Sequence, residues 1–151
     1  MRISIGRFFV FLHGFFRRGT TRFNDAENKI LAHLLAALPP VECEILRKQL
    51  LSLRLVQRPQ PGRISIAYFR APEDLEPLPY PGYEYCLATV SYKSANKTKT
   101  TAIVLHDGRL MTFERNVPRE LNEIESLGKV VLHPKKFTTV TDEIDTEEHG
   151  R

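Results

Sequence analysis

The sequence is poor in cysteine and contains no tryptophan. Its two cysteines, Cys43 and Cys86, lie far apart, without a CxxC pair or a histidine nearby. This pattern excludes a disulfide-dense scaffold and the common zinc spacings. Both cysteines have apolar neighbours, so we expect free thiols packed in the core, with a single bridge between them as the alternative.

Catalytic motifs are also absent. The sequence has no GxSxG, P-loop or GxGxxG pattern, and its five histidines are scattered without HxH, HxxxH or HExxH spacing. His106 beside Asp107 could pair a base with a carboxylate, but Asp107-Gly108 is a strong turn signal that already accounts for the aspartate. We therefore predict a non-enzymatic protein with no metal site and no cofactor.

Long hydrophobic runs are missing, although residues 7–18, "RFFVFLHGFFRR", contain five phenylalanines. The apolar run is nine residues long, and a membrane-spanning helix needs about 20. His13 and Gly14 interrupt it and two arginines follow it, which argues against a secretory signal. Three interpretations stay open: a segment packed on the domain, which we favour, an amphipathic helix on a membrane or partner surface, and a targeting segment.

The net charge of +4 is unevenly distributed. Residues 1–24 contain five arginines and no acid, whereas residues 141–151 contain five acids and one arginine. The high pI therefore reflects mainly the first segment and is weak support for nucleic-acid binding. We divide the chain into a basic aromatic arm (1–23), a single domain (24–140) and an acidic tail (141–151). Arm and tail could pair between two copies, which would favour a homodimer.

Two helices are predicted first. Asn24 and Glu27 have the spacing of a capping box, and apolar residues then recur at helical spacing through Leu38. Pro39 ends this helix, and Pro40 suits the first turn of a second helix that runs to about Gln49. The inward positions of the second helix are expected to be Val41, Ile45 and Leu46.

Strands follow the helices. Period-two patterns predict a hairpin over residues 51–55 and 64–68, with a turn at "RPQPGR", and three strands at about 85–93, 98–106 and 109–115. A two-residue turn at Asp107-Gly108 would pair His106 with Arg109. The expected pairs beyond it are Val104 with Met111 and Ala102 with Phe113, on the face toward the helices, with Ile103, Leu105 and Leu110 on the opposite face.

The last elements are a short helix from Pro118 that stops at Gly128, and a short strand over residues 129–133. Together these elements predict an α+β fold: an N-terminal helix pair packed on a mostly antiparallel, five- to six-stranded meander sheet. A chain of this length can bury about 68–70% of its unfolded surface in one core.

The preferred binding site is the loop at residues 71–84, which contains four prolines. Prolines lower the entropy lost on ordering, and tyrosines offer rigid amphipathic contact area. The site residues are expected to be Tyr80, Tyr83, Glu84 and Tyr85. The alternative is that the loop covers the sheet with Leu75, Leu78 and its tyrosines.

A basic strip is expected on the neighbouring hairpin strands, from Lys93, Lys97, Lys99, Arg109 and Arg115. Such a strip could bind nucleic acid. Lysines on exposed sheet edges also block edge pairing, so a solvated surface is the favoured interpretation.

The helix pair followed by "IVLHDGRLMTFE" resembles small bacterial toxin-immunity proteins. The resemblance covers one hairpin and the order of elements, and it implies no functional residue. We predict a cytoplasmic module that binds a protein or peptide, with nucleic-acid binding, an immunity-like role and attachment to a membrane surface through residues 7–18 as alternatives.

Overall fold

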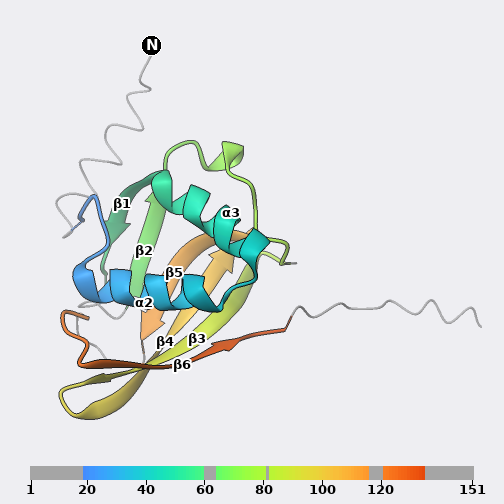
Figure 1. Ribbon diagram of the computed structural model, residues 1–151. Coiled ribbons are helices and arrows are strands. Elements are labelled where there is room, and N and C mark those ends of the chain that lie inside the picture. The colour runs from blue at the N-terminus through green and yellow to red at the C-terminus, as the bar shows by residue number, and fades with distance from the viewer. Residues whose placement is uncertain (1–18, 60–63, 81, 116–120, 135–151) are drawn as a thin grey trace, which may run out of the picture.

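Two helices cover one face of a six-stranded antiparallel sheet (Figure 1). The structure, a computed structural model, describes residues 19–59, 64–80, 82–115 and 121–134. Predictions for residues 7–18, for most of the "RPQPGR" turn and for the acidic tail lie outside these ranges. The α+β class and the helices-first order are confirmed.

The helices are α2 (Asp25–Ala37) and α3 (Pro40–Leu51). The capping box is confirmed: the Glu27 amide donates to Asn24 Oδ1 at 2.8 Å, and the Asn24 amide donates to Glu27 Oε2 at 2.9 Å. Two predictions on the second helix are wrong. Leu51 belongs to α3 and not to a strand, because the helix continues two residues past Gln49, and Val41 is 71% exposed because its side of α3 faces away from the sheet.

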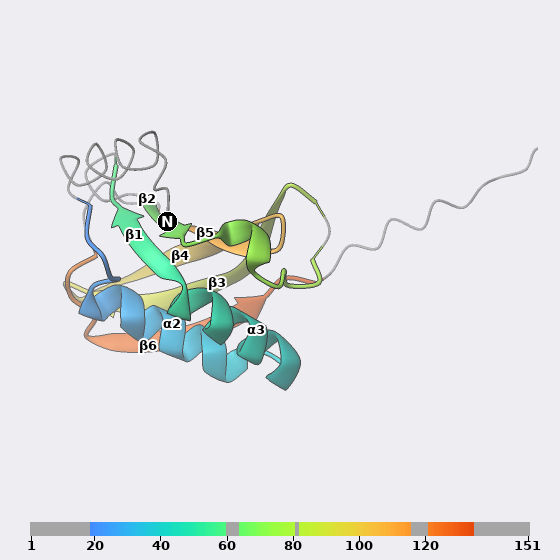
Figure 2. The ribbon, with the colours of Figure 1, turned by 90° about the horizontal axis from the view of Figure 1, so that it is seen from above.

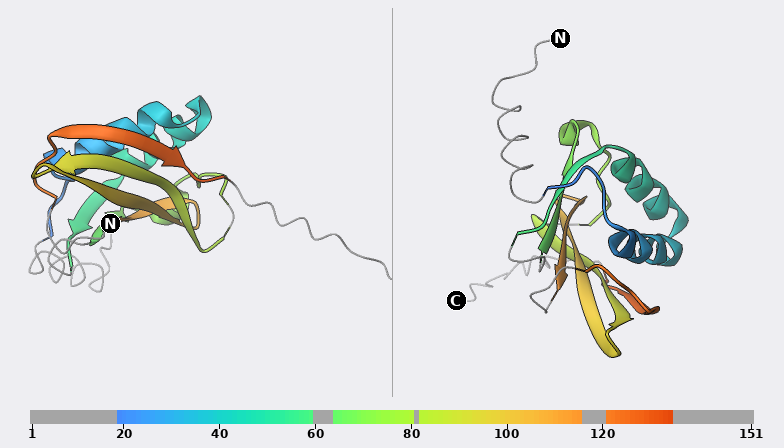
Figure 3. Two further views of the ribbon diagram at one scale, coloured as in Figure 1. Left: turned by 90° about the horizontal axis from the view of Figure 1, so that it is seen from below. Right: turned by 90° about the vertical axis from the view of Figure 1, so that its left-hand side faces the viewer.

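The strands are β1 (Leu53–Gln57), β2 (Ile64–Phe69), β3 (Glu84–Ser94), β4 (Lys97–His106), β5 (Arg109–Arg115) and β6 (Ser126–Leu132). Their order in the sheet is β1-β2-β5-β4-β3-β6, and every pairing is antiparallel. Strands β3, β4 and β5 form a meander, with β2 added outside β5 and β6 added outside β3. Both helices lie on the same side of this sheet (Figures 2 and 3).

The β4–β5 turn is formed by Asp107 and Gly108, both with positive φ (47° and 73°), and His106 pairs with Arg109 as predicted. Leu105 then pairs with Leu110, but Val104 pairs with Thr112. Met111 is therefore the extra residue of a β-bulge.

The bulge makes the other predicted pairs wrong. Ala102 pairs with Glu114, and Phe113 lies opposite Ile103. Because one extra residue reverses the alternation beyond Leu110, Phe113 joins Leu110 on the face of Ile103 and Leu105. All four side chains are buried in the core, so the face predicted to be outward is the one under the helices.

The helix predicted from Pro118 to Gly128 is also wrong within the described residues. Residues 121–125 are not helical, and Ser126 to Gly128 begin β6. Pairing with β3 outweighs the local helical pattern, and the Lys129 amide also donates to Ser91 Oγ at 2.7 Å. Gly128 lies close to β3, because a Cβ added there would be 3.2 Å from the Ser91 carbonyl oxygen.

The core lies between the helices and the inner face of the sheet. It includes Phe23, whose ring stacks on Phe113 with centroids 5.1 Å apart. Thr20 exchanges two backbone hydrogen bonds with Val56 of β1, at 2.9 and 2.7 Å. The packed unit thus reaches into the segment before α2. Cys43 and Cys86 are free, half-buried thiols, and Cys43 packs against the core.

Candidate functional site

The proline-rich loop is anchored to α3 and to the β4–β5 turn. The buried Gln49 side chain donates to the carbonyl oxygens of Glu76 and Gly108, at 2.9 and 3.1 Å, and accepts from the Leu110 amide at 3.0 Å. The Leu78 amide also donates to the Gly108 carbonyl oxygen, at 2.7 Å, and the Leu78 side chain is buried. Much of the loop therefore covers the core, as in the alternative interpretation.

Tyr80 and Tyr85 point into the molecule. Their rings lie 4.7 Å apart, and the Tyr80 hydroxyl donates to the buried Glu42 carboxylate at 2.6 Å. Burial, reinforced by the bond to Glu42, raises the pKa of Tyr80 well above its ordinary value. The Tyr85 hydroxyl donates to the His133 carbonyl oxygen at 2.8 Å, and burial raises the pKa of Tyr85 as well. In this conformation both tyrosines pack the structure.

Tyr83 is different, because its side chain is 68% exposed. Its ring lies edge-on against the His106 ring, with centroids 4.0 Å apart, and its carbonyl oxygen accepts from the Asp107 amide at 3.0 Å. Glu84 pairs with His106 across the strands, and the Asp107 carboxylate lies 3.5 Å from His106 Nε2. Arg109 follows the same turn. We call Tyr83, Glu84, His106, Asp107 and Arg109 the Tyr83 rim.

The Arg109 guanidinium faces inward from the Tyr83 rim. It donates to the Asp107 carbonyl oxygen at 3.1 Å and to the Leu75 carbonyl oxygen at 3.0 Å. Arg109 therefore anchors the proline-rich loop to the turn. The exposed side chains of the rim are thus one aromatic ring, that of Tyr83, and the carboxylates of Glu84 and Asp107, which suits contacts with a cationic or apolar side chain.

The predicted basic strip is divided between distant places. Lys93 and Lys97 are exposed at the β3–β4 turn. His106 lies at the other end of β4, about 30 Å from Lys97 at 3.3 Å per residue. Lys99 is half-buried, and its Nζ lies 3.4 Å from Ser94 Oγ. Arg115 is only 2% exposed and donates to Ser65 Oγ at 3.0 Å. The described residues form no continuous basic strip.

The structure also shows a groove that the sequence did not indicate. Three neighbouring hollows, of about 340, 560 and 650 Å³, share Arg22 as a lining residue. Leucines line the two smaller ones, and Arg54 and Arg70 line one of these. Leu51, 87% exposed, lies beside these arginines. We call this surface the Arg22 groove. It joins segments that are far apart in the sequence, so no local pattern could have revealed it.

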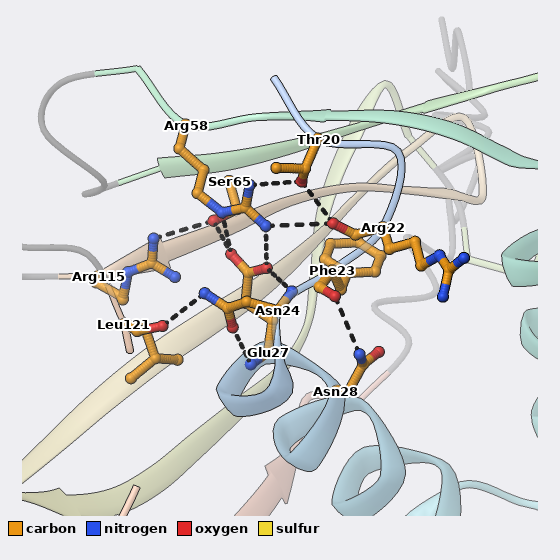
Figure 4. A network of polar contacts seen from close by, with 10 residues as sticks. All are labelled: Thr20, Arg22, Phe23, Asn24, Glu27, Asn28, Arg58, Ser65, Arg115 and Leu121. Carbon is orange, nitrogen blue, oxygen red and sulfur yellow. Dashed lines mark hydrogen bonds and ion pairs between the residues drawn. The ribbon is translucent and has the colours of Figure 1, made fainter. Parts of the chain in front are cut away.

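A buried polar network holds one wall of the Arg22 groove (Figure 4). The Glu27 carboxylate accepts from Arg58 Nε and Nη2, at 3.0 and 2.6 Å, and from Ser65 Oγ at 2.5 Å. Arg58 Nη1 donates to Thr20 Oγ1 at 2.8 Å, and Nη2 also lies 3.4 Å from the Arg22 carbonyl oxygen. The segment that carries Arg22 is thus tied to α2, β1 and β2.

Comparison with known proteins adds no relative. No protein-family model matches the chain, and neither the curated proteins nor the solved structures gave a significant match. The resemblance to toxin-immunity proteins stays a prediction. Within the described ranges, no helix is long and apolar enough to cross a membrane, and no cluster of three or more histidine, cysteine or acidic side chains could hold a metal ion.

Proposed function

We propose that the chain is a non-enzymatic binding module that recognises a protein or peptide through the Tyr83 rim. The observation that carries the proposal is the exposure of Tyr83 on a backbone fixed by the Asp107 amide. The anchors of the preceding loop, from Gln49 and Arg109, further limit its motion. An exposed aromatic side chain on a rigid support loses little conformational entropy on binding.

The charges of the rim favour a basic partner. Glu84 and Asp107 are both exposed, whereas the Arg109 guanidinium is engaged by two carbonyl oxygens. A lysine or arginine of the partner can lie over the Tyr83 ring or pair with one of these carboxylates. We therefore expect a peptide that combines a cationic side chain with an apolar one.

The experiment is selection from a random peptide library on the folded full chain, followed by affinity measurement by fluorescence anisotropy. Truncation of an interface anchor raises Kd about tenfold or more, and we expect this for Tyr83→Ala. Tyr68→Ala is the matched control, because Tyr68 is also exposed but lies on β2. Equal affinities for Tyr83→Ala and the original chain would refute the proposed site.

The alternatives have less support. Two residues of the predicted basic strip are poorly placed to bind a nucleic acid, because Arg115 is buried and Lys99 bonds to Ser94. Attachment to a membrane concerns residues 7–18, outside the described residues. Cytoplasmic location and homodimer formation also stay predictions.

A further inference from the structure

We propose that the acidic segment 141–151 docks in the Arg22 groove of its own chain, with Ile144 in the leucine-lined part and its carboxylates beside the arginines. This inference is independent of the binding role assigned to the Tyr83 rim. It gives the groove one defined occupant.

The groove combines an apolar floor with basic edges. Leu31, Leu35, Leu50 and Leu53 line its smallest hollow, and Arg22 lines all three hollows. Arg70 is exposed beside Leu50 and Leu53. None of the described residues that line the three hollows is acidic. An occupant must therefore supply both an apolar side chain and carboxylates.

Residues 141–151 have this composition. Ile144 is the single aliphatic side chain of the segment, and Asp142, Glu143 and Asp145 surround it. Its insertion among leucines removes apolar surface from water, and the flanking carboxylates come within reach of Arg22 and Arg70. The segment thus carries an apolar residue flanked by acids, and this pattern complements a groove whose leucines are flanked by arginines.

The chain is long enough to reach the groove. The described part ends at Pro134, whose carbonyl oxygen accepts from the Tyr85 hydroxyl at 2.5 Å. The Tyr85 ring packs at a tilt against the Tyr80 ring, and the Tyr80 hydroxyl bonds to Glu42 in the first turn of α3. Leu50 is eight residues further along α3, or about 12 Å at 1.5 Å per residue. The ten residues from Pro134 to Ile144 extend up to about 33–36 Å.

Tethering makes even a weak contact significant. A short tether gives an effective concentration of about 1 mM, so a segment with an intrinsic Kd of about 1 mM would occupy the groove about half of the time. Each exposed ion pair contributes about 1.4- to 5-fold in affinity. Reversing two charges should then weaken docking about tenfold and lower occupancy about fivefold.

The test is photo-crosslinking in the full chain. Ile144 is replaced by p-benzoylphenylalanine, and crosslinked tryptic peptides are identified by mass spectrometry. We expect crosslinks within one chain to Leu31 or Leu35, to the peptide of residues 49–54, "QLLSLR", or to residues 19–22. Their yield should fall about fivefold in Arg22→Glu/Arg70→Glu and also fall in 1 M salt. Because Arg22→Glu removes a tryptic site, residues 19–22 are then found in the peptide of residues 19–29.

Matched variants separate docking from general effects. Lys93→Glu/Lys97→Glu makes the same change of charge at the far β3–β4 turn and should leave the yield unchanged. Asp142→Asn/Asp145→Asn changes no described residue, so it should reduce the yield even if the arginine variant folds poorly. Crosslinks mainly to residues 1–18, to another surface or between two chains would overturn the proposal, as would an unchanged yield in both charge variants.

Discussion

Removal of the Glu27 charge should strongly destabilise the protein. The Glu27 side chain is fully buried, and its carboxylate accepts four hydrogen bonds: two from Arg58, one from Ser65 and one from the Asn24 amide. The Arg58 side chain is only 8% exposed. In Glu27→Gln the guanidinium keeps its burial but loses its counter-charge. Removing one partner of a buried ion pair costs about 3–5 kcal/mol, against a total stability of about 5–15 kcal/mol for a typical domain.

The assay is urea unfolding followed by circular dichroism, with the free energy of unfolding extrapolated to water. Arg58→Met should be destabilising for the converse reason, because it leaves the Glu27 carboxylate buried without its cation. The double variant Glu27→Leu/Arg58→Met removes both charges and should be more stable than either single variant, since apolar replacement of a whole buried pair is often neutral. A loss below about 1 kcal/mol in Glu27→Gln would refute the reasoning, because the pair would then behave like an exposed one.

Three further predictions concern close packing and burial. Gly108→Ala should cost about 2 kcal/mol or more in unfolding free energy, because φ is +73° and the new Cβ would lie 2.5 Å from the Leu78 carbonyl oxygen; denaturant unfolding tests it. Gly128→Ala should cost about 1–3 kcal/mol by pressing on Ser91, whereas Lys129→Ala, the matched exposed change on β6, should stay within about 0.5 kcal/mol. Burial raises the pKa of Tyr80, so the folded state holds the phenolic proton more tightly and the unfolding free energy should fall as pH rises above about 10. Unfolding curves from pH 8 to 11.5 test this: the fall should be smaller in Tyr80→Phe, and an equal fall would contradict it.

The features predicted correctly from the sequence depend on local chemistry. Asn24 and Glu27 define the start of α2 through a capping box, and the two prolines that follow Leu38 separate the helices. Asp107-Gly108 forms the expected tight turn because both residues adopt positive φ. In each case the signal lies within a few residues of the feature, so no knowledge of distant partners is needed.

The wrong predictions involve partners that are distant in the sequence. The bulge at Met111 has no local signature, yet it decides which side chains of β5 share a face with Ile103 and Leu105 of β4. β6 forms because residues 126–132 pair with β3, whereas the sequence around Pro118 has a helical pattern. Non-local pairing overrides such local preference because it determines which side chains are buried.

The candidate site was only partly predictable for the same reason. Composition identified the proline- and tyrosine-rich loop, but it could not distinguish Tyr83 from Tyr80, whose hydroxyl has a buried carboxylate partner. That distinction depends on Glu42, which is 38 residues away in the sequence. An amphipathic side chain near a sheet becomes part of the core or part of the surface according to the acceptors available to it.

Net charge is an equally indirect guide to binding in this chain. Arg58 and Arg115 contribute to the basic pI, yet both are buried in the network around Ser65. Only the exposed charges can contact a partner. At the Arg22 groove these charges are positive, because arginines line the groove and none of its described lining residues is acidic. Buried charges affect stability with little dependence on salt, whereas exposed ones act on partners and are screened. Added salt should therefore weaken docking at the groove well before it affects the Glu27–Arg58 pair, so the two roles of arginine can be separated in one protein.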